Sequence, residues 1–221
     1  MNIPVVDLAD FTNGDDAAKK SFVQQLGTAY EQVGFVAVKN HGISDELIAN
    51  LYTQVQQFFA MSTAEKKKYE IAGLAGQRGY TSFGKEHAKG YDAPDLKEFF
   101  QFGQVVSEGE PEKELYPDNV VVSEIPSFTP TLLSAFRGFE TAGAALLRAI
   151  ALFLNLEETY FAEHIHNGNS ILRAIYYPPI TEEPASAIRA EQHEDINLIT
   201  LLVGASADGL EILNMQGEWI P

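Results

Sequence analysis

The sequence predicts an α+β fold, because stretches with helical periodicity and stretches with strand character both occur along its 221 residues. Between residues 16 and 33, Phe22, Leu26 and Tyr30 recur at the spacing of one helix face, which is typical of an amphipathic helix. Residues 35–39 and 98–103 are short and rich in Val or Phe, as strands are. A chain of this length buries one sizeable core or two small ones.

The other expected helices carry start signals. A helix begins at Ser44, and Ser62 with Glu65 forms a capping box that opens a short basic helix. A long helix covers about 130–154, with Thr129 as its cap and Pro130 at its first position. Gly143 on the apolar stripe of that helix allows a neighbouring backbone to come close.

Strands are expected at both ends of the chain. Residues 3–8 favour a short opening strand, and the apolar run Ile196–Val203 favours a buried strand. Residues 209–213 and 217–221 favour a further hairpin. The Gly-rich stretch 73–95 favours a long excursion of the kind that is uncommon in compact domains unless it is functional.

Composition excludes several classes of partner. Fifteen basic against thirty-one acidic residues give a net charge of −16, which argues against nucleic acid and against anionic membrane surfaces. There are no cysteines, so any metal must use His, Asp or Glu. The N-terminus has no signal segment and no apolar run approaches a membrane span of about 20 residues, so we expect a cytoplasmic protein without a membrane partner.

The strongest chemical signal is His193-Glu194-Asp195. In an extended chain, residues i and i+2 point to one face, so His193 and Asp195 present an imidazole and a carboxylate to the same point. These are two of the three ligands in the two-His-one-carboxylate triad that holds non-haem Fe(II). Glu191 shares that face, but it lies about 13 Å from Asp195 along a strand, too far for one ion. A bare His-x-Asp is also common at surface strand ends.

The remaining histidines have simpler explanations. His41 follows Asn40 and precedes Gly42, which favours a turn residue that hydrogen-bonds backbone over a metal ligand. His164 and His166 follow a predicted short helix that starts at Glu157, and histidine suits a helix C-terminus because of the helix dipole.

The order of motifs around His193 resembles the isopenicillin N synthase-like family of Fe(II)- and 2-oxoglutarate-dependent dioxygenases. The family pattern L-R-x-x-x-Y-P-P corresponds to residues 172–179, and H-x-D-x-x-x-x-T-L-L corresponds to residues 193–202. G-L-x-V and G-x-W correspond to residues 209–212 and 217–219, with Ile at the place of Val. Upstream, Gly34 to Ile43 resembles the segment G-F-x-x-V-x-N-H-G-I that opens this family.

This resemblance implies an N-terminal helical region, residues 1–125, packed on a double-stranded β-helix, or jelly roll, whose supporting helix and first strands fill residues 126–221. It implies an enzyme that uses Fe(II), 2-oxoglutarate and O2 to hydroxylate or desaturate a small organic substrate. His193 and Asp195 would hold the metal, and Tyr177 would hydrogen-bond the distal carboxylate of 2-oxoglutarate. Arg78 and Tyr80 would help to shape the substrate pocket, although an ion pair between Arg78 and an acid such as Glu98 is an equal alternative.

The resemblance also implies a third ligand, a histidine well past Asp195, and an arginine that binds 2-oxoglutarate. Neither residue type occurs in the 26 positions after Asp195. We therefore expect the chain to be the front part of a longer protein with an incomplete jelly roll. On its own it would bind Fe(II) weakly and would not turn over.

Two departures from the family pattern loosen any assignment to plant hormone or flavonoid enzymes. Ile175 stands where many plant members have Asn, and Glu194 stands where Thr is more usual. Arg173 either guides substrate or pairs with a nearby acid. Two other functions stay open: an Fe(II) oxidase that needs no 2-oxoglutarate, and a metal-free jelly-roll binding module. The sequence does not indicate an oligomeric state.

Overall fold

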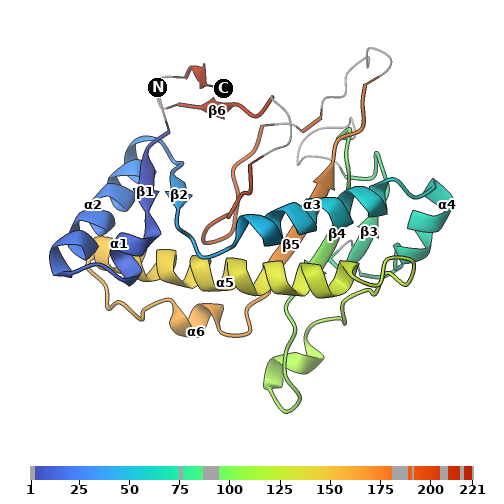
Figure 1. Ribbon diagram of the computed structural model, residues 1–221, viewed down its shortest axis with the longest axis horizontal. Helices are drawn as coiled ribbons and strands as arrows, with labels where there is room; N and C mark the ends of the chain where they lie inside the picture. The colour runs from blue at the N-terminus through green and yellow to red at the C-terminus, as the bar shows by residue number, and fades with distance from the viewer. Residues whose placement is uncertain are drawn as a thin grey trace. The chain divides into compact units, whose positions relative to one another are not determined.

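The computed structural model describes residues 3–74, 77–86, 95–180, 189–190, 192–204, 209–214 and 217–220. Helices and strands are mixed, and the chain divides into two compact units, each assembled from separate stretches (Figure 1). Unit 1 comprises Met1–Ile43, Gly138–His166 and Asn197–Pro221, and unit 2 comprises Ser44–Arg137 and Asn167–Ile196. The division at residue 125 that we expect from the sequence follows chain order and stays a prediction.

Unit 1 contains most of the small elements at the two ends of the chain. Its elements are β1 (Val5–Asp7), α1 (Leu8–Thr12), α2 (Asp16–Gln32), β2 (Ala37–Lys39), the second part of α5 (Phe128–Phe153), α6 (Ala162–Ile165), β6 (Ile212–Leu213) and β7 (Trp219–Ile220). Strands β1 and β2 pair in parallel, and β6 and β7 form the antiparallel hairpin that the sequence predicts. The core joins Phe22 and Leu26 of α2 to Leu146 and Ala149 of α5.

Local chemistry explains where these elements begin and end. The Asp15 carboxylate accepts a hydrogen bond from the backbone N–H of Ala18 and caps α2. Gly34 then has φ of +78°, a conformation that glycine adopts without strain, and it follows the last turn of α2. His41 accepts a hydrogen bond from the N–H of Ile43 at 3.2 Å, which confirms the turn role expected for it.

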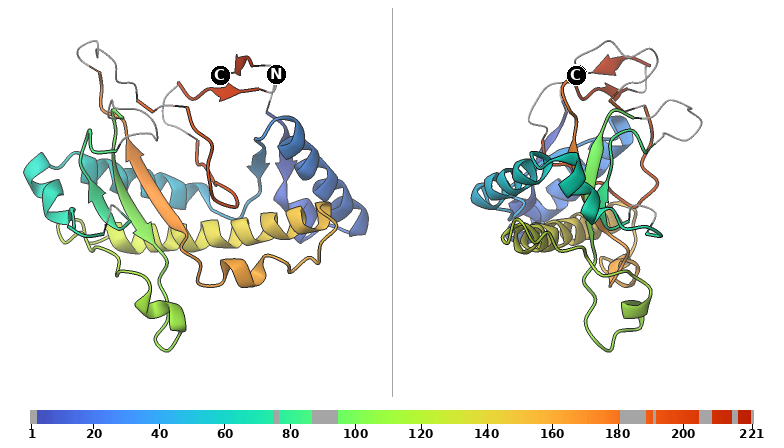
Figure 2. Two further views of the ribbon diagram at one scale, coloured as in Figure 1. Left: turned by 180° about the vertical axis from the view of Figure 1, so that it is seen from behind. Right: turned by 90° about the vertical axis from the view of Figure 1, so that its right-hand side faces the viewer.

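Unit 2 contains the largest sheet. Its elements are α3 (Asp45–Phe59), α4 (Thr63–Lys66), the 3-10 helix η1 (Lys67–Tyr69), β3 (Gly79–Thr81), β4 (Glu98–Gly103), the 3-10 helix η2 (Pro111–Glu114), the first part of α5 and β5 (Ile171–Tyr176). The strands lie in the order β3-β4-β5 and all pair antiparallel, side by side in both views of Figure 2. The capping box expected at Ser62 and Glu65 is present at the start of α4.

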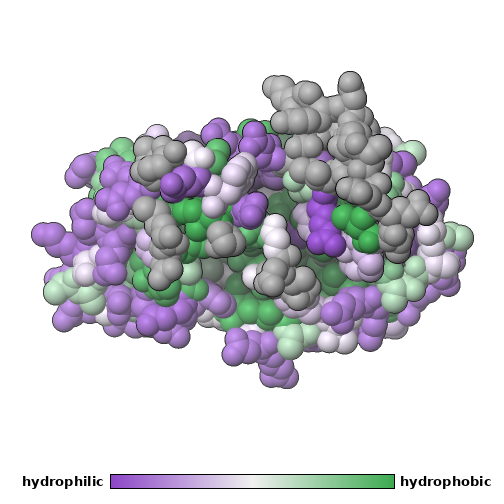
Figure 3. Space-filling model, turned by 90° about the horizontal axis from the view of Figure 1, so that it is seen from above, coloured by the Kyte–Doolittle hydropathy of each residue, from purple (hydrophilic) through white to green (hydrophobic). Residues whose placement is uncertain are grey.

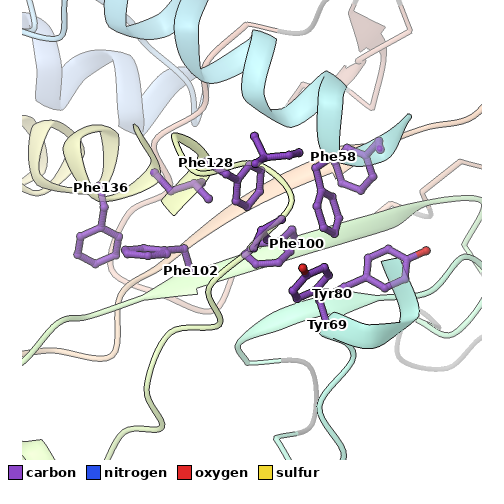
Figure 4. Close-up of a cluster of buried hydrophobic side chains, with 11 residues drawn as sticks. Phe58, Tyr69, Tyr80, Phe100, Phe102, Phe128 and Phe136 are labelled. Atoms are coloured by element: carbon purple, nitrogen blue, oxygen red, sulfur yellow. The ribbon is translucent and has the colours of Figure 1, made fainter. Parts of the chain in front are cut away.

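Aromatic side chains fill the core of unit 2. Phe100 of β4 lies 5.0 Å, centroid to centroid, from both Phe58 of α3 and Phe128 of α5. Figure 4 shows these rings pointing toward one another from the helices and the sheet, with Phe102 against Phe136 further along. Alternate residues of β4 therefore meet the helices, and we call this side of the sheet the core face.

Two predictions about elements are wrong. Residues Ile196–Val203 form no strand, and Ile196, Leu198 and Leu202 are exposed. The described residues place no strand alongside this run to receive its backbone hydrogen bonds, so it does not form part of a sheet. The long helix begins at Phe128, so Thr129 lies inside α5 instead of capping it.

The face of the molecule in Figure 3 shows hydrophobic residues exposed between hydrophilic ones, which agrees with the exposure of several large apolar side chains. Within the described part of the chain, no helix combines the length and the apolar character that crossing a membrane requires.

Candidate active site

The predicted metal ligands lie together on one irregular segment of unit 2. Residues 192–196 have no regular secondary structure, yet Nε2 of His193 lies 3.7 Å from Oδ1 of Asp195. Their side chains are 60% and 49% exposed. The imidazole and the carboxylate therefore lie next to each other and are both accessible from solvent.

The donor set fits Fe(II) as a pair and not as a triad. Imidazole and carboxylate are the ligand types of non-haem Fe(II) sites, and a separation below 4 Å allows both to reach one ion. However, among the described residues no group of three His, Cys, Asp or Glu side chains is placed to hold a metal. His193 and Asp195 as ligands of Fe(II) therefore stay a prediction, and the described residues place no third protein ligand beside them.

Behind the core face of the β3-β4-β5 sheet is a second face, which we call the Phe99 face. It bears the side chains that alternate with the core residues: Thr81, Phe99, Gln101, Arg173 and Ile175. The register places Gln101 opposite Arg173 and Phe99 opposite Ile175. Phe99 and Gln101 are buried, whereas Ile175 is exposed. This face therefore carries apolar side chains, Phe99 and Ile175, next to the polar side chains of Gln101 and Arg173.

Arg173 contacts an aromatic ring and an acid on this face. Its guanidinium carbon lies 4.5 Å from the centroid of the Phe99 ring, within the range of a cation–π interaction. Its Nη1 donates to Oε1 of Glu86 at 3.1 Å. Arg173 therefore meets an acid, which agrees with one of the two roles that its sequence allows.

Lys97 links Glu86 to a second acid. Its ammonium group lies 2.8 Å from Glu86 and 2.7 Å from Asp95, and the Lys97 and Asp95 side chains are buried. Burial alone lowers the pKa of Lys97, but the hydrogen bonds that its ammonium group donates to Asp95 and Glu86 outweigh this effect, and the pKa is raised. Lys97 is thus a charged ammonium at neutral pH, and it holds both carboxylates.

Tyr177 directly follows β5 and is 37% exposed. Extending the alternation of β5 by one residue puts Tyr177 on the side of Arg173 and Ile175, which is the Phe99 face. A phenol at the end of a strand, reachable from solvent, has the position that a ligand-binding hydroxyl needs. Its role toward 2-oxoglutarate stays a prediction.

Arg78 and Tyr80 lie deeper than pocket residues usually do. Tyr80 is in the aromatic core, where its hydroxyl donates to Glu98, and burial together with that carboxylate raises the pKa of Tyr80. Arg78 is 1% exposed and packs against Gly103. Within the described chain, Nε and Nη2 of Arg78 have no hydrogen-bond partner, and burial lowers the pKa of Arg78.

The alternative ion pair between Arg78 and Glu98 is not formed, because Glu98 binds Lys66 instead. The pocket roles of Arg78 and Tyr80 stay predictions. A hollow of about 290 Å³ elsewhere in unit 2 is lined by residues 104–106, Lys113 and residues 116–119, none of which was expected in the site.

Three residues that contact Arg173 or its partner are not among the predicted site residues. Phe99 lies in the expected strand 98–103, Glu86 in the expected excursion 73–95, and Lys97 between the two. The alternation of β4 and β5 was a usable signal, because Phe99 and Arg173 occupy positions that face away from the core. The ion pair between Arg173 and Glu86 has no local sequence signal.

Comparison with known proteins identifies the class. Residues 3–124 match the family model described as "non-haem dioxygenase in morphine synthesis N-terminal". The chain is 30% identical to proline hydroxylase buaE of Petromyces alliaceus, over all of this chain and 70% of the relative. Other relatives are named 2-oxoglutarate-Fe(II) type oxidoreductases.

Solved structures agree. A 2OG-Fe(II) oxygenase family protein from Caulobacter crescentus superposes with a TM-score of 0.85 at 36% identity, covering 99% of this chain and 69% of that one. A full-length Neurospora crassa protein, solved in complex with alpha-KG (2-oxoglutarate) and thymine, superposes with a TM-score of 0.84 at 26% identity, with the coverage again 99% and 69%.

The chain therefore belongs to the non-haem, Fe(II)- and 2-oxoglutarate-dependent dioxygenases. This class uses Fe(II) as cofactor and 2-oxoglutarate and O2 as cosubstrates. The chain spans about 70% of the length of the relatives it matches.

Proposed function

We propose that His193 and Asp195 bind Fe(II), and that the Phe99 face receives the small organic molecule that the enzyme hydroxylates or desaturates. The observation that carries this proposal is the 3.7 Å approach of the imidazole to the carboxylate on one segment. Bound Fe(II), with O2 and 2-oxoglutarate, supplies the oxidising power that removes hydrogen from the substrate.

The residues of this chain divide the work. His193 and Asp195 fix the metal, and the Tyr177 hydroxyl donates a hydrogen bond to the distal carboxylate of 2-oxoglutarate. Ile175, the exposed apolar side chain of the Phe99 face, offers a surface against which a substrate packs and excludes water. A relative named proline hydroxylase and a neighbour solved with thymine support a small organic substrate.

We further propose that the β3-β4-β5 sheet is part of a jelly roll. Its core face is covered by the aromatic residues of α3 and α5, and its Phe99 face keeps exposed positions at Arg173 and Ile175. A sheet with one covered and one accessible face suits a jelly roll that closes around a site. The acidic charge of −16 supports a partner other than nucleic acid or an anionic membrane.

The test is metal binding measured separately from turnover. We expect His193→Ala and Asp195→Asn to lower the affinity for Fe(II) at least ten-fold in anaerobic titrations, with loss of any succinate formation from 2-oxoglutarate. His164→Ala is the matched control, because His164 lies at the end of α6 and stacks on Tyr160. Equal Fe(II) affinity in all three variants and the wild type would refute the proposed ligands.

A further inference from the structure

We propose that the substrate carries a carboxylate, and that Arg173 receives this carboxylate by exchanging it for Glu86. The inference rests on the proposed function, since it assigns a substrate class to the same face of the sheet. Arg173 then determines substrate specificity, and the Glu86 carboxylate binds Arg173 until the carboxylate of the substrate replaces it.

The geometry of Arg173 is that of a prepared anion receptor. The guanidinium lies over the Phe99 ring at 4.5 Å, and Phe99 is itself buried in the central strand, so the charged group has a fixed apolar platform. The Arg173 side chain is 37% exposed, so an incoming molecule reaches it from solvent. A planar guanidinium matches the two oxygens of a carboxylate, which gives geometric as well as electrostatic recognition.

Breaking the ion pair between Glu86 and Arg173 costs little free energy. The two side chains meet at 3.1 Å with both partly exposed, and such pairs contribute little to stability. Glu86 also keeps a second cation, because Lys97 lies 2.8 Å away and is buried. After the exchange, Glu86 and Asp95 still share Lys97, so neither acid is left as an unpaired charge.

Replacing a carboxylate partner of Lys97 by a ligand is unfavourable. Lys97 is enclosed between Asp95 and Glu86, and removing either partner would leave a buried charge less compensated. Of the two cations Arg173 and Lys97, Arg173 is therefore the one that an anionic ligand can bind. An anionic substrate therefore competes with Glu86 for Arg173.

That competition defines the experiment. The probes are two matched pairs, L-proline with L-prolinamide and benzoate with benzamide, which differ mainly in carrying a carboxylate or a neutral amide. Dissociation constants are measured by NMR titration, with the Nε–H signal of Arg173 as the local reporter. The proteins are the wild type, Arg173→Gln, Glu86→Gln and, as a charge-loss control, Arg148→Gln, whose partner is Glu158 on unit 1.

We expect at least one acid to bind the wild type with a shift of the Arg173 signal, and its amide to bind at least ten-fold more weakly. Arg173→Gln removes that preference, and Arg148→Gln keeps it. Glu86→Gln strengthens binding of the acid about three-fold and leaves the amide unchanged, a gain that a purely structural role for the ion pair would not produce. Thermal unfolding of each variant confirms that it is folded.

Three results would overturn the proposal: no preference for either acid over its amide, including no binding; an unchanged preference in Arg173→Gln; or weaker acid binding in Glu86→Gln. A loss of 2-oxoglutarate affinity in Arg173→Gln larger than the loss of acid affinity would assign the residue to the cosubstrate and overturn it as well. The comparison of each acid with its amide does not depend on Fe(II) affinity, so the failure of this proposal is distinct from the failure of His193 and Asp195 as ligands.

Discussion

The ammonium group of Lys66 lies 2.7 Å and 2.8 Å from the two carboxylate oxygens of Glu98, and both side chains are more than nine-tenths buried. Lys66 also donates to the carbonyl of Phe59 at 3.3 Å, and Tyr80 donates to Glu98. This buried ion pair ties α4 to the central strand of the sheet, on the side opposite the proposed substrate surface. We assign this ion pair a structural role, because the Lys66 ammonium, the Glu98 carboxylate and the Tyr80 hydroxyl are hydrogen-bonded to one another.

Breaking this pair should destabilise the protein. We expect Lys66→Met to lower the free energy of unfolding by about 3–5 kcal/mol, because it leaves the Glu98 carboxylate buried without its counter-ion. Urea denaturation measures the change. Lys68→Met is the control, since Lys68 is 61% exposed and meets Glu124 at 3.3 Å, and it should change stability by less than about 1 kcal/mol. Similar effects of both substitutions would contradict this account.

Stability should depend on pH through Glu70. Burial alone would raise the pKa of this carboxyl, but hydrogen bonds from Lys85 and Ser82 outweigh it and the pKa lies below its ordinary value. A lowered folded-state pKa stabilises the fold above the unfolded-state pKa of about 4.3, and this stabilisation is lost as the pH falls below it.

Glu70→Gln should therefore flatten the acid side of the stability profile. Unfolding free energies measured between pH 6 and pH 3 should fall less steeply in the variant than in the wild type. Parallel profiles for the two proteins would show that Glu70 is not the group responsible.

Gly103 should not tolerate a side chain. A Cβ built on Gly103 would overlap the Arg78 guanidinium, which is fully buried against it. We expect Gly103→Ala to cost about 1–3 kcal/mol of stability, the range for overpacking a well-filled core. Gly204→Ala is the control, because a Cβ there meets nothing within 4 Å. A Gly103→Ala protein with the wild-type melting temperature would mean that Arg78 has room to move.

Tyr177→Phe should weaken 2-oxoglutarate specifically. Losing one hydrogen bond to a charged group is worth about 1.5–3 kcal/mol, which corresponds to a rise in the dissociation constant of about ten-fold or more. Calorimetry with Mn(II) in place of Fe(II) measures this without turnover. Tyr160→Phe, at an exposed position in unit 1, should leave the affinity unchanged. Equal affinities in the two variants would remove Tyr177 from the cosubstrate site.

The elements with local signals could be predicted from the sequence. Helix α2, expected between residues 16 and 33, and the β6-β7 hairpin agree with the sequence because periodicity and turn residues act within a few residues. The run Ile196–Val203 was misjudged because a strand forms only where another strand accepts its hydrogen bonds, and the apolar pattern does not report that.

The candidate site divides in the same way. His193 and Asp195 were found from a two-residue spacing, and the structure brings their side chains together even though the segment is not a strand. The contact of Arg173 with Glu86 joins positions 87 residues apart in the chain, and the stacking of Arg173 on Phe99 depends on the register of two strands. Long-range pairings of this kind follow from the assembled sheet, which a single sequence does not specify.

Strand β4 is bonded to a neighbour on each edge, and all six of its residues are buried. An amide hydrogen in either of these ladders can meet water only if the strand that accepts it separates from β4, so no small fluctuation exposes it. Deuterium should therefore enter β4 more slowly than any other strand described here. Phe99, on which Arg173 stacks, thus belongs to a slowly exchanging strand, and it would keep its position while ligands bind and dissociate.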